Sequence, residues 1–123
     1  MSQWTHIMAC FRIDTIYMER CPNFDINSPH GSEGGLHFQI WRNPRDSDIA
    51  RFTVTVFGDL RDTDISGIED TRKWFEECCQ PTNMYYIRDA VLHINHEFNG
   101  IYIYTWQDNE VKIVGKREKD DHA

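Results

Sequence analysis

The side chains best suited to metal chemistry in this chain lie close together in the sequence: His93, His96 and Glu97. On a helix, a spacing of three residues would let both imidazoles reach one zinc ion. The surrounding residues favour a strand, and on a strand positions 93 and 96 point to opposite faces. The order also differs from the metalloprotease motif, in which two histidines bracket the glutamate. We therefore predict half-exposed strand histidines here and no metal site.

Cysteine chemistry is the second possibility. Cys78 and Cys79 are adjacent, and neither they nor Cys10 and Cys21 form a C-x-x-C arrangement. Adjacent residues on a helix point about 100° apart, which suits neither a shared metal ion nor an unstrained disulfide. We predict free thiols, with Cys78 as a small core residue.

The glycine-rich segment Gly31–Gly35 resembles a phosphate-binding loop only in composition. It precedes a strand, lacks the Lys-Ser/Thr of a nucleotide loop and carries Glu33, which would repel an anion. The chain has no Gly-x-Ser-x-Gly sequence and no cysteine and histidine placed as a pair. We predict no catalytic residue and no cofactor, and a protein that is not an enzyme.

Aromatic residues share one face of a late segment: Tyr102, Tyr104 and Trp106 alternate with Ile101 and Ile103. An outward aromatic face could stack on bases, as in RNA-recognition domains. Basic residues that would hold phosphates are missing around it, so we favour a small core beneath this hairpin.

Acidic residues are concentrated between positions 59 and 70. Part of this acid suits the positive end of a following helix, which Asp62 and Asp64 would precede. The surplus could occupy the basic groove of a partner. The predicted binding residues are Asp59, Arg61, Asp62, Asp64, Glu69 and Asp70.

Composition agrees with a protein-binding rather than a nucleic-acid-binding surface. The 123 residues include 20 acidic and 13 basic side chains, for a net charge of −7. Such a charge disfavours direct binding to nucleic acid or anionic membranes and favours a basic partner. No signal peptide or long apolar run is visible, so we expect a soluble, intracellular protein.

Alternating apolar residues predict three strands in the first half of the chain. The strand Trp4–Asp14 would bury one face, and Leu36–Trp41 and Ile49–Phe57 would form a hairpin around the polar turn Asn43–Asp48. Gly58–Asp62 is then a charged turn into a helix. The buried face of the first strand is Thr5, Ile7, Ala9, Phe11 and Ile13.

A helix follows this turn. Ser66 and Glu69 fit a capping box, and Pro81 marks the end of the helix. Its predicted buried residues are Ile68, Thr71, Trp74, Phe75 and Cys78.

The C-terminal third is predicted to form strands. Tyr85–Phe98 fits a helix or a strand, and Asn99-Gly100 decides for a strand because both residues of this hairpin signal accept positive φ. Ile101–Trp106 returns, and a turn at Asp108-Asn109 leads to a short strand over Glu110–Val114.

This order predicts one α+β domain over residues 1–115, with a charged, frayed tail over 116–123. The fold is an antiparallel sheet packed by one main helix. Thr15–Cys21 could hold one or two helical turns, which Pro22 ends. If this segment stands where a helix once ran, the fold is a ferredoxin-like sandwich with a C-terminal β-hairpin extension.

Four short motifs resemble a group of small uncharacterised proteins encoded in bacteriophage and prophage genomes. The similarity spans residues 4 to about 97, although those proteins have a long helix where this chain has only Thr15 to His30. The motifs are Trp4-Thr5-His6-Ile7, Gly31-Ser32-Glu33-Gly34, Gly58-Asp59-Leu60-Arg61-Asp62 and Tyr86-Ile87-Arg88-Asp89.

The resemblance implies a phage-encoded accessory protein that acts in the host cytoplasm. Its expected function is stoichiometric inhibition of a host defence complex, and an anti-CRISPR protein is the sharpest form of this expectation. The partner would be a basic, nucleic-acid-binding host protein, met through the acidic residues, and the inhibitor could be a homodimer.

An alternative hypothesis from a different class is a sponge that holds a signalling nucleotide between aromatic rings and arginines. Its candidate residues are Trp41, Arg42, Arg61 and Arg88. A metal-dependent enzyme at His93 and His96 is the third possibility.

Overall fold

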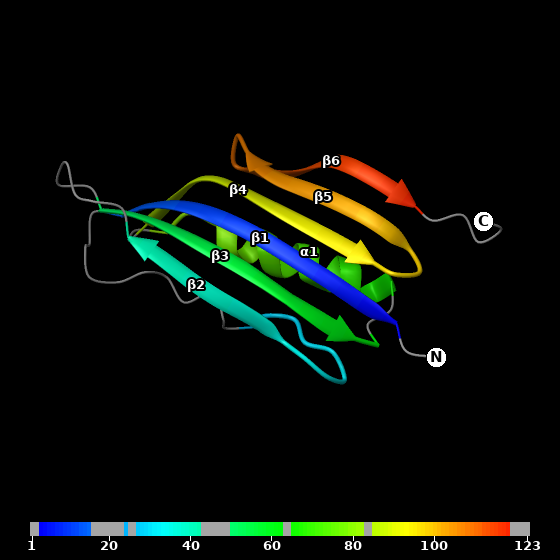
Figure 1. Cartoon of the computed structure of the whole chain (residues 1–123). Coiled ribbons are helices and arrows are strands. Elements are labelled where there is room, and N and C mark those ends of the chain that lie inside the picture. Colours follow the sequence, from blue (N-terminus) through cyan, green and yellow to red (C-terminus); the bar gives the residue numbers. More distant parts are fainter. Residues whose placement is uncertain are drawn as a thin grey trace.

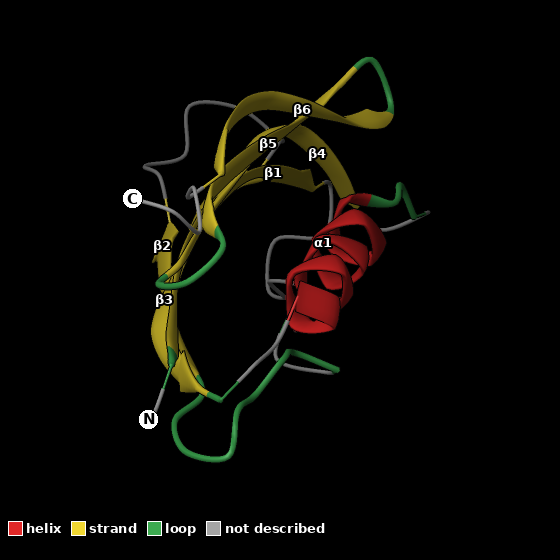
Figure 2. Ribbon diagram, turned by 90° about the vertical axis from the view of Figure 1, so that its right-hand side faces the viewer, coloured by secondary structure: helices red, strands yellow, loops and turns green. Residues whose placement is uncertain are grey.

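An antiparallel sheet curved around one helix makes up the described part of the protein (Figures 1 and 2). The computed structural model describes residues 3–15, 24, 27–42, 50–62, 65–82 and 85–118. The elements are β1 (Trp4–Thr15), β2 (Leu36–Arg42), β3 (Ala50–Arg61), α1 (Ile65–Cys79), β4 (Tyr85–His96), β5 (Gly100–Gln107) and β6 (Glu110–Glu118). Their order across the sheet is β2-β3-β1-β4-β5-β6.

Strand β1 lies at the centre of the sheet, paired with β3 on one side and β4 on the other. Both pairings are antiparallel, with Trp4 opposite Arg61 in β3 and Thr5 opposite His96 in β4. Helix α1 connects β3 to β4 and crosses the concave side of the sheet, as Figure 2 shows. We call the side that carries α1 the inner face and the opposite side the outer face.

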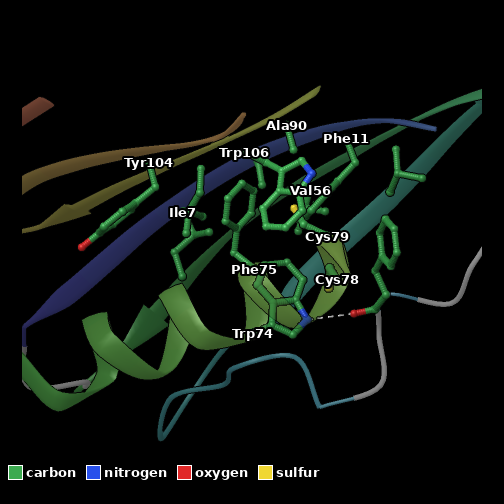
Figure 3. Close-up of a cluster of buried hydrophobic side chains, with 14 of the residues drawn as sticks. Ile7, Phe11, Val56, Trp74, Phe75, Cys78, Cys79, Ala90, Tyr104 and Trp106 are labelled. Atoms are coloured by element: carbon green, nitrogen blue, oxygen red, sulfur yellow. Dashed lines mark hydrogen bonds between the residues drawn. The ribbon is translucent and has the colours of Figure 1, made fainter. Parts of the chain in front are cut away.

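The core lies between the inner face and α1. Strand alternation directs Ile7, Phe11 and Ile13 inward, and all three are at most 1% exposed. From the helix, Phe75 packs against Phe11 with ring centroids 5.4 Å apart. Trp74 also contacts Phe11, and its indole nitrogen donates a hydrogen bond to the carbonyl oxygen of Phe24 at 3.0 Å (Figure 3). Burial of each such side chain contributes about 1.5–3 kcal/mol.

Most of the predicted apolar pattern is confirmed. The inner residues of β1 and all five predicted helix residues are buried. Tyr102, Tyr104 and Trp106 are also buried, because β5 directs them toward α1. The base-stacking interpretation of these aromatics is therefore wrong, and the core interpretation is confirmed.

The predicted charged turn at Gly58–Asp62 is wrong over its first four residues. Gly58 to Arg61 continue β3, because they pair with Ile7 to Trp4 of β1. Only Asp62, with φ of 60°, leaves the strand. The helix begins at Ile65, so Ser66 lies inside it and does not occupy the predicted N-cap position.

The hairpins differ in detail from the prediction. The β4–β5 loop has three residues, Glu97 to Asn99, and the positive φ of 115° falls on Gly100 alone. Asp108 and Asn109 both have positive φ, as a two-residue type I′ turn requires.

One predicted strand is longer than expected, and three predicted segments lie wholly or mostly outside the described residues. β6 extends to Glu118, beyond the predicted Val114, because it pairs with β5 as far as Gly100. The predicted turn at Asn43–Asp48 and the end of the chain from residue 119 lie outside the described residues. The same holds for residues 16–21 of the segment Thr15–Cys21, where one or two helical turns are predicted, whereas Thr15 itself belongs to β1.

Candidate functional site

Three of the four sequence motifs meet at one end of the sheet. Trp4–Ile7 of β1 pairs with Gly58–Arg61 of β3. The segment 31–34 lies along the same strand end, where Ser32 N donates to Arg61 O at 2.9 Å and Arg61 N donates to Glu33 O at 3.1 Å. The motif at 86–89 lies toward the other end of the sheet, beside Asp14 and Arg12. The fold therefore joins segments that are far apart in the sequence into one surface.

Glycine in the segment 31–34 permits this close approach. Gly34 has φ of 81°, and a Cβ at this position would collide with the carbonyl oxygen of Asp59. Backbone contact and a positive φ thus explain the glycine without any bound phosphate.

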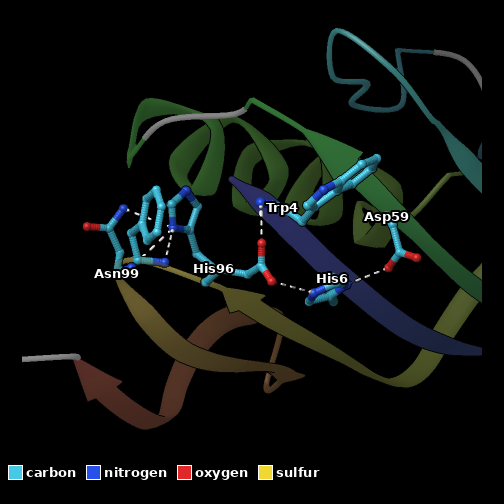
Figure 4. Close-up of polar contacts among 7 residues, drawn as sticks. Trp4, His6, Asp59, His96 and Asn99 are labelled. Carbon is cyan, nitrogen blue, oxygen red and sulfur yellow. Dashed lines mark hydrogen bonds and ion pairs between the residues drawn. The ribbon is translucent and has the colours of Figure 1, made fainter. Parts of the chain in front are cut away.

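His6 lies between two carboxylates on the outer face (Figure 4). Its Nδ1 is 2.6 Å from Asp59 Oδ1, and its Nε2 is 3.7 Å from Glu97 Oε2. Glu97 is held in place because its Oε1 accepts a hydrogen bond from Trp4 N at 2.8 Å. All three side chains of this His6 cluster are more than 40% exposed, so they remain accessible to a partner.

A second group of charges adjoins the first. Arg61 Nη1 lies 3.0 Å from Glu33 Oε1, and Arg61 Nε lies 3.6 Å from Asp62 Oδ2. Asp62 is fixed further by a hydrogen bond from Ser32 Oγ at 3.1 Å and by its own backbone N–H, which donates to Gln3 O at 2.7 Å. We call the combined surface the acidic end. It consists of Glu33, Asp59, Asp62 and Glu97 around His6 and Arg61.

The structure divides the predicted binding residues. Asp59, Arg61 and Asp62 lie in the acidic end, whereas Glu69 and Asp70 lie on α1, on the other side of the sheet. Asp64 lies outside the described residues. The predicted group is therefore not one surface.

Glu69 already has a cationic partner within the helix. Arg72 donates to its Oε1 from Nε at 2.9 Å and also reaches Glu76 Oε2 from Nη1 at 2.7 Å. The hydrogen bond from Arg72 holds the pKa of Glu69 below its usual range. The charge of Glu69 also contributes to the raised pKa of Tyr104, after the larger effect of burial.

Glu33, His6 and Glu97 are functional candidates that sequence reasoning missed. Two of them stand inside quoted motifs, which was the available signal. The sequence suggested Glu97 only as a zinc ligand. Its nearness to Trp4 and His6 follows from strand pairing, which sequence spacing does not show.

His93 and His96 lie on opposite faces, as predicted, but the prediction of half-exposed side chains is wrong for His96. His93 is opposite Met8 on the outer face, and His96 is fully buried opposite Thr5. His96 Nδ1 accepts hydrogen bonds from the backbone nitrogens of Phe98 and Asn99 at 3.2 and 3.1 Å, so it serves the β4–β5 loop. Among the described residues, no group of three or more His, Cys, Asp or Glu side chains is arranged to hold a metal ion.

Of two further candidate sets, the nucleotide residues are not assembled at one place, whereas the prediction of Cys78 as a core residue with a free thiol is confirmed. Arg61 lies opposite Trp4, whereas Arg88 contacts Asp14 near the other end of β1, so the proposed nucleotide set is split. Cys78 and Cys79 are buried in the core, and burial raises the pKa of the Cys78 thiol to about 12 and that of Cys79 further. Neither is a nucleophile at neutral pH.

Comparison of the chain with protein-family models, curated proteins and solved structures found no match. Within the described residues, no helix has the length and apolar character needed to cross a membrane.

Proposed function

We propose that this protein is a phage-encoded accessory protein that inhibits a host defence complex by stoichiometric binding, with the acidic end as its contact surface. The observation that carries this proposal is the convergence of three motifs on four carboxylates at one exposed end of the sheet. In its sharpest form the target is a CRISPR effector in the host cytoplasm. The phage origin rests on the resemblance of the four motifs.

The geometry supports recognition of a basic partner. Asp59, Asp62 and Glu97 are each positioned by hydrogen bonds or ion pairs that leave part of the carboxylate exposed. Carboxylates fixed before binding lose little side-chain entropy when an arginine or lysine reaches them. The net charge of −7 also favours rapid association with a basic nucleic-acid channel.

The strand order supports the ferredoxin-like derivation that accompanies this proposal. The order β2-β3-β1-β4 with a helix between β3 and β4 is compatible with such a sandwich, and β5 and β6 then extend it.

Neutralisation of the acidic end tests the proposal. The variant combines Asp59→Asn, Asp62→Asn and Glu97→Gln, which removes three negative charges and keeps side-chain size. Asparagine also tolerates the positive φ at position 62. The measurement is phage plating on a host that carries the defence system, with each protein expressed there. Wild-type protein should restore plating, and the variant should lose at least about tenfold of this effect.

A matched control removes the same charge elsewhere. It combines Asp70→Asn, Glu77→Gln and Asp108→Asn, all exposed, and Asp108 also has a positive φ. This control should inhibit as the wild type does. If the neutralised acidic end inhibits equally well while folded, the proposed contact surface is wrong.

A further inference from the structure

Three arginines from three adjacent strands surround one hollow, at the opposite end of the sheet from the acidic end. Arg51 of β3, Arg12 of β1 and Arg88 of β4 line a cavity of about 350 Å³, together with Cys10 and Asp14. This volume is within the range of small-molecule sites. The hollow lies outside the surface used by the proposed function.

An irregularity in the strand pairing brings Arg88 to this place. Arg12 is opposite Asp89, but the next residue, Ile13, is opposite Ile87, so Arg88 is an extra residue in β4. Such a β-bulge lets two consecutive residues face the same side of the sheet. Arg88 and Asp89 are accordingly both exposed, and both belong to the motif at 86–89, which the acidic end does not use.

The arginines are only partly neutralised. Arg12 Nε is 3.4 Å from Asp89 Oδ1, and Arg88 Nε is 3.4 Å from Asp14 Oδ2. Arg51 Nε lies 3.8 Å from the other oxygen of Asp14, which is too far for a hydrogen bond. Each ion pair is a single long contact, unlike the 2.7 Å hydrogen bond between Arg72 and Glu76.

The local charge balance is unusual for this chain. Among the described residues, three guanidinium groups share two carboxylates around the hollow, whereas the whole protein has a net charge of −7. The carboxylate of Asp14 opposes an anion in the hollow, and its Oδ1 is buried without a hydrogen-bond partner among the described residues. Solubility does not explain this cluster of arginines, because arginines spread over the surface would serve solubility equally well.

We propose that this hollow binds a small molecule through its phosphate or diphosphate group. Adjacent strands lie about 4.8 Å apart, so guanidinium groups on three neighbouring strands can approach one tetrahedral anion from different sides. Guanidinium forks match phosphate oxygens and stay charged at every physiological pH. The proposal is independent of the proposed function, because it uses other residues at the other end of the sheet.

Titration calorimetry of the full chain with sodium pyrophosphate at low ionic strength tests this site. Wild-type protein should bind the probe, and added sodium chloride should weaken the binding. Arg12→Gln and Arg88→Gln should each weaken it about tenfold. Asp14→Asn should strengthen it several-fold, because this change removes the carboxylate that competes for Arg51 and Arg88.

Arg117→Gln is the matched control. Arg117 is exposed on β6 and remote from the hollow in the sheet, so its replacement should leave pyrophosphate binding unchanged. Circular dichroism confirms that each variant is folded. Absence of binding to the wild type, or an equal loss in R117Q and R88Q, would overturn the proposal. Titration with inorganic phosphate distinguishes the two groups, since tighter binding of pyrophosphate assigns the site to a diphosphate and equal binding to a single phosphate.

Discussion

At the residue scale, the three described cysteines differ in the surroundings of the sulfur atom. Cys78 and Cys79 lie in the core beneath the sheet, whereas Cys10 is half-buried on the outer face and lines the arginine hollow. Burial raises the pKa of all three thiols, and for Cys78 it reaches about 12. Deeper burial and a large rise in pKa therefore both protect the two core thiols, whereas Cys10 lies within reach of a reagent.

Alkylation with iodoacetamide at neutral pH should modify Cys10 while Cys78 and Cys79 stay protected in the folded protein. The reason is that a core thiol reacts only through opening of the structure. Peptide mass spectrometry at several times measures each rate, and denaturation in urea should make the three rates similar. Equal rates of Cys10 and Cys78 in the native protein would contradict the packing of α1.

The roles of individual residues were harder to predict from the sequence than the secondary-structure elements were. The buried face of β1 follows from local alternation, so Ile7 and Phe11 could be assigned without a structure. The pairing of His6 with Asp59 depends on residues 53 positions apart. Local sequence patterns do not show which residues far apart in the chain meet in space. For this reason the sequence grouped Asp59 with Glu69, although the two lie on different sides of the sheet.

At the element scale, glycine positions determine how closely strands and loops can approach. Gly100 opens β5 with φ of 115°, directly after the three-residue loop that His96 stabilises. A Cβ there would meet the carbonyl oxygen of Arg117 on β6. This position thus controls two hairpins, β4–β5 and β5–β6.

Gly100→Ala should destabilise the protein by about 2 kcal/mol or more, because both the strained φ and the collision with β6 oppose it. Gly35→Ala is the control. A Cβ at Gly35 meets nothing within 4 Å and its φ is not positive, so the change should be neutral or slightly stabilising. Urea denaturation followed by circular dichroism compares the two variants. A similar free energy of unfolding for both would refute the assigned backbone strain.

Element boundaries were predictable where one local signal decides them. Alternation and helical spacing located β1 and α1 to within a few residues. The end of β3 was missed because Gly58 and Asp59 have poor strand propensity. Pairing with β1 on one side, and with the segment 32–36 on the other, overrides that propensity.

At the scale of the whole molecule, the two faces of the sheet have different roles. The inner face and α1 form the core, whereas the outer face carries the acidic end and the arginine hollow at opposite ends of the strands. In the described residues, no helix covers the outer face (Figure 2). Stability should therefore depend on one face and binding on the other.

Phe75→Ala should lower the free energy of unfolding by about 3–5 kcal/mol, because it leaves a cavity beside Phe11. This loss is a large part of the total stability of a small domain. Phe57→Ala removes a ring that is 46% exposed on the outer face and should cost less than about 1 kcal/mol. Urea titration with tryptophan fluorescence measures both. A larger cost for Phe57 would show that the outer face is also packed.

The central place of β1 has a consequence for synthesis on the ribosome. This strand is synthesised before both of its partners, which are residues 50–61 and 85–96. Until translation has passed residue 96, at least one edge of β1 has unpaired backbone groups. Nascent chains must therefore protect this apolar strand until β4 has been synthesised, which favours binding by chaperones and slow closure of the sheet.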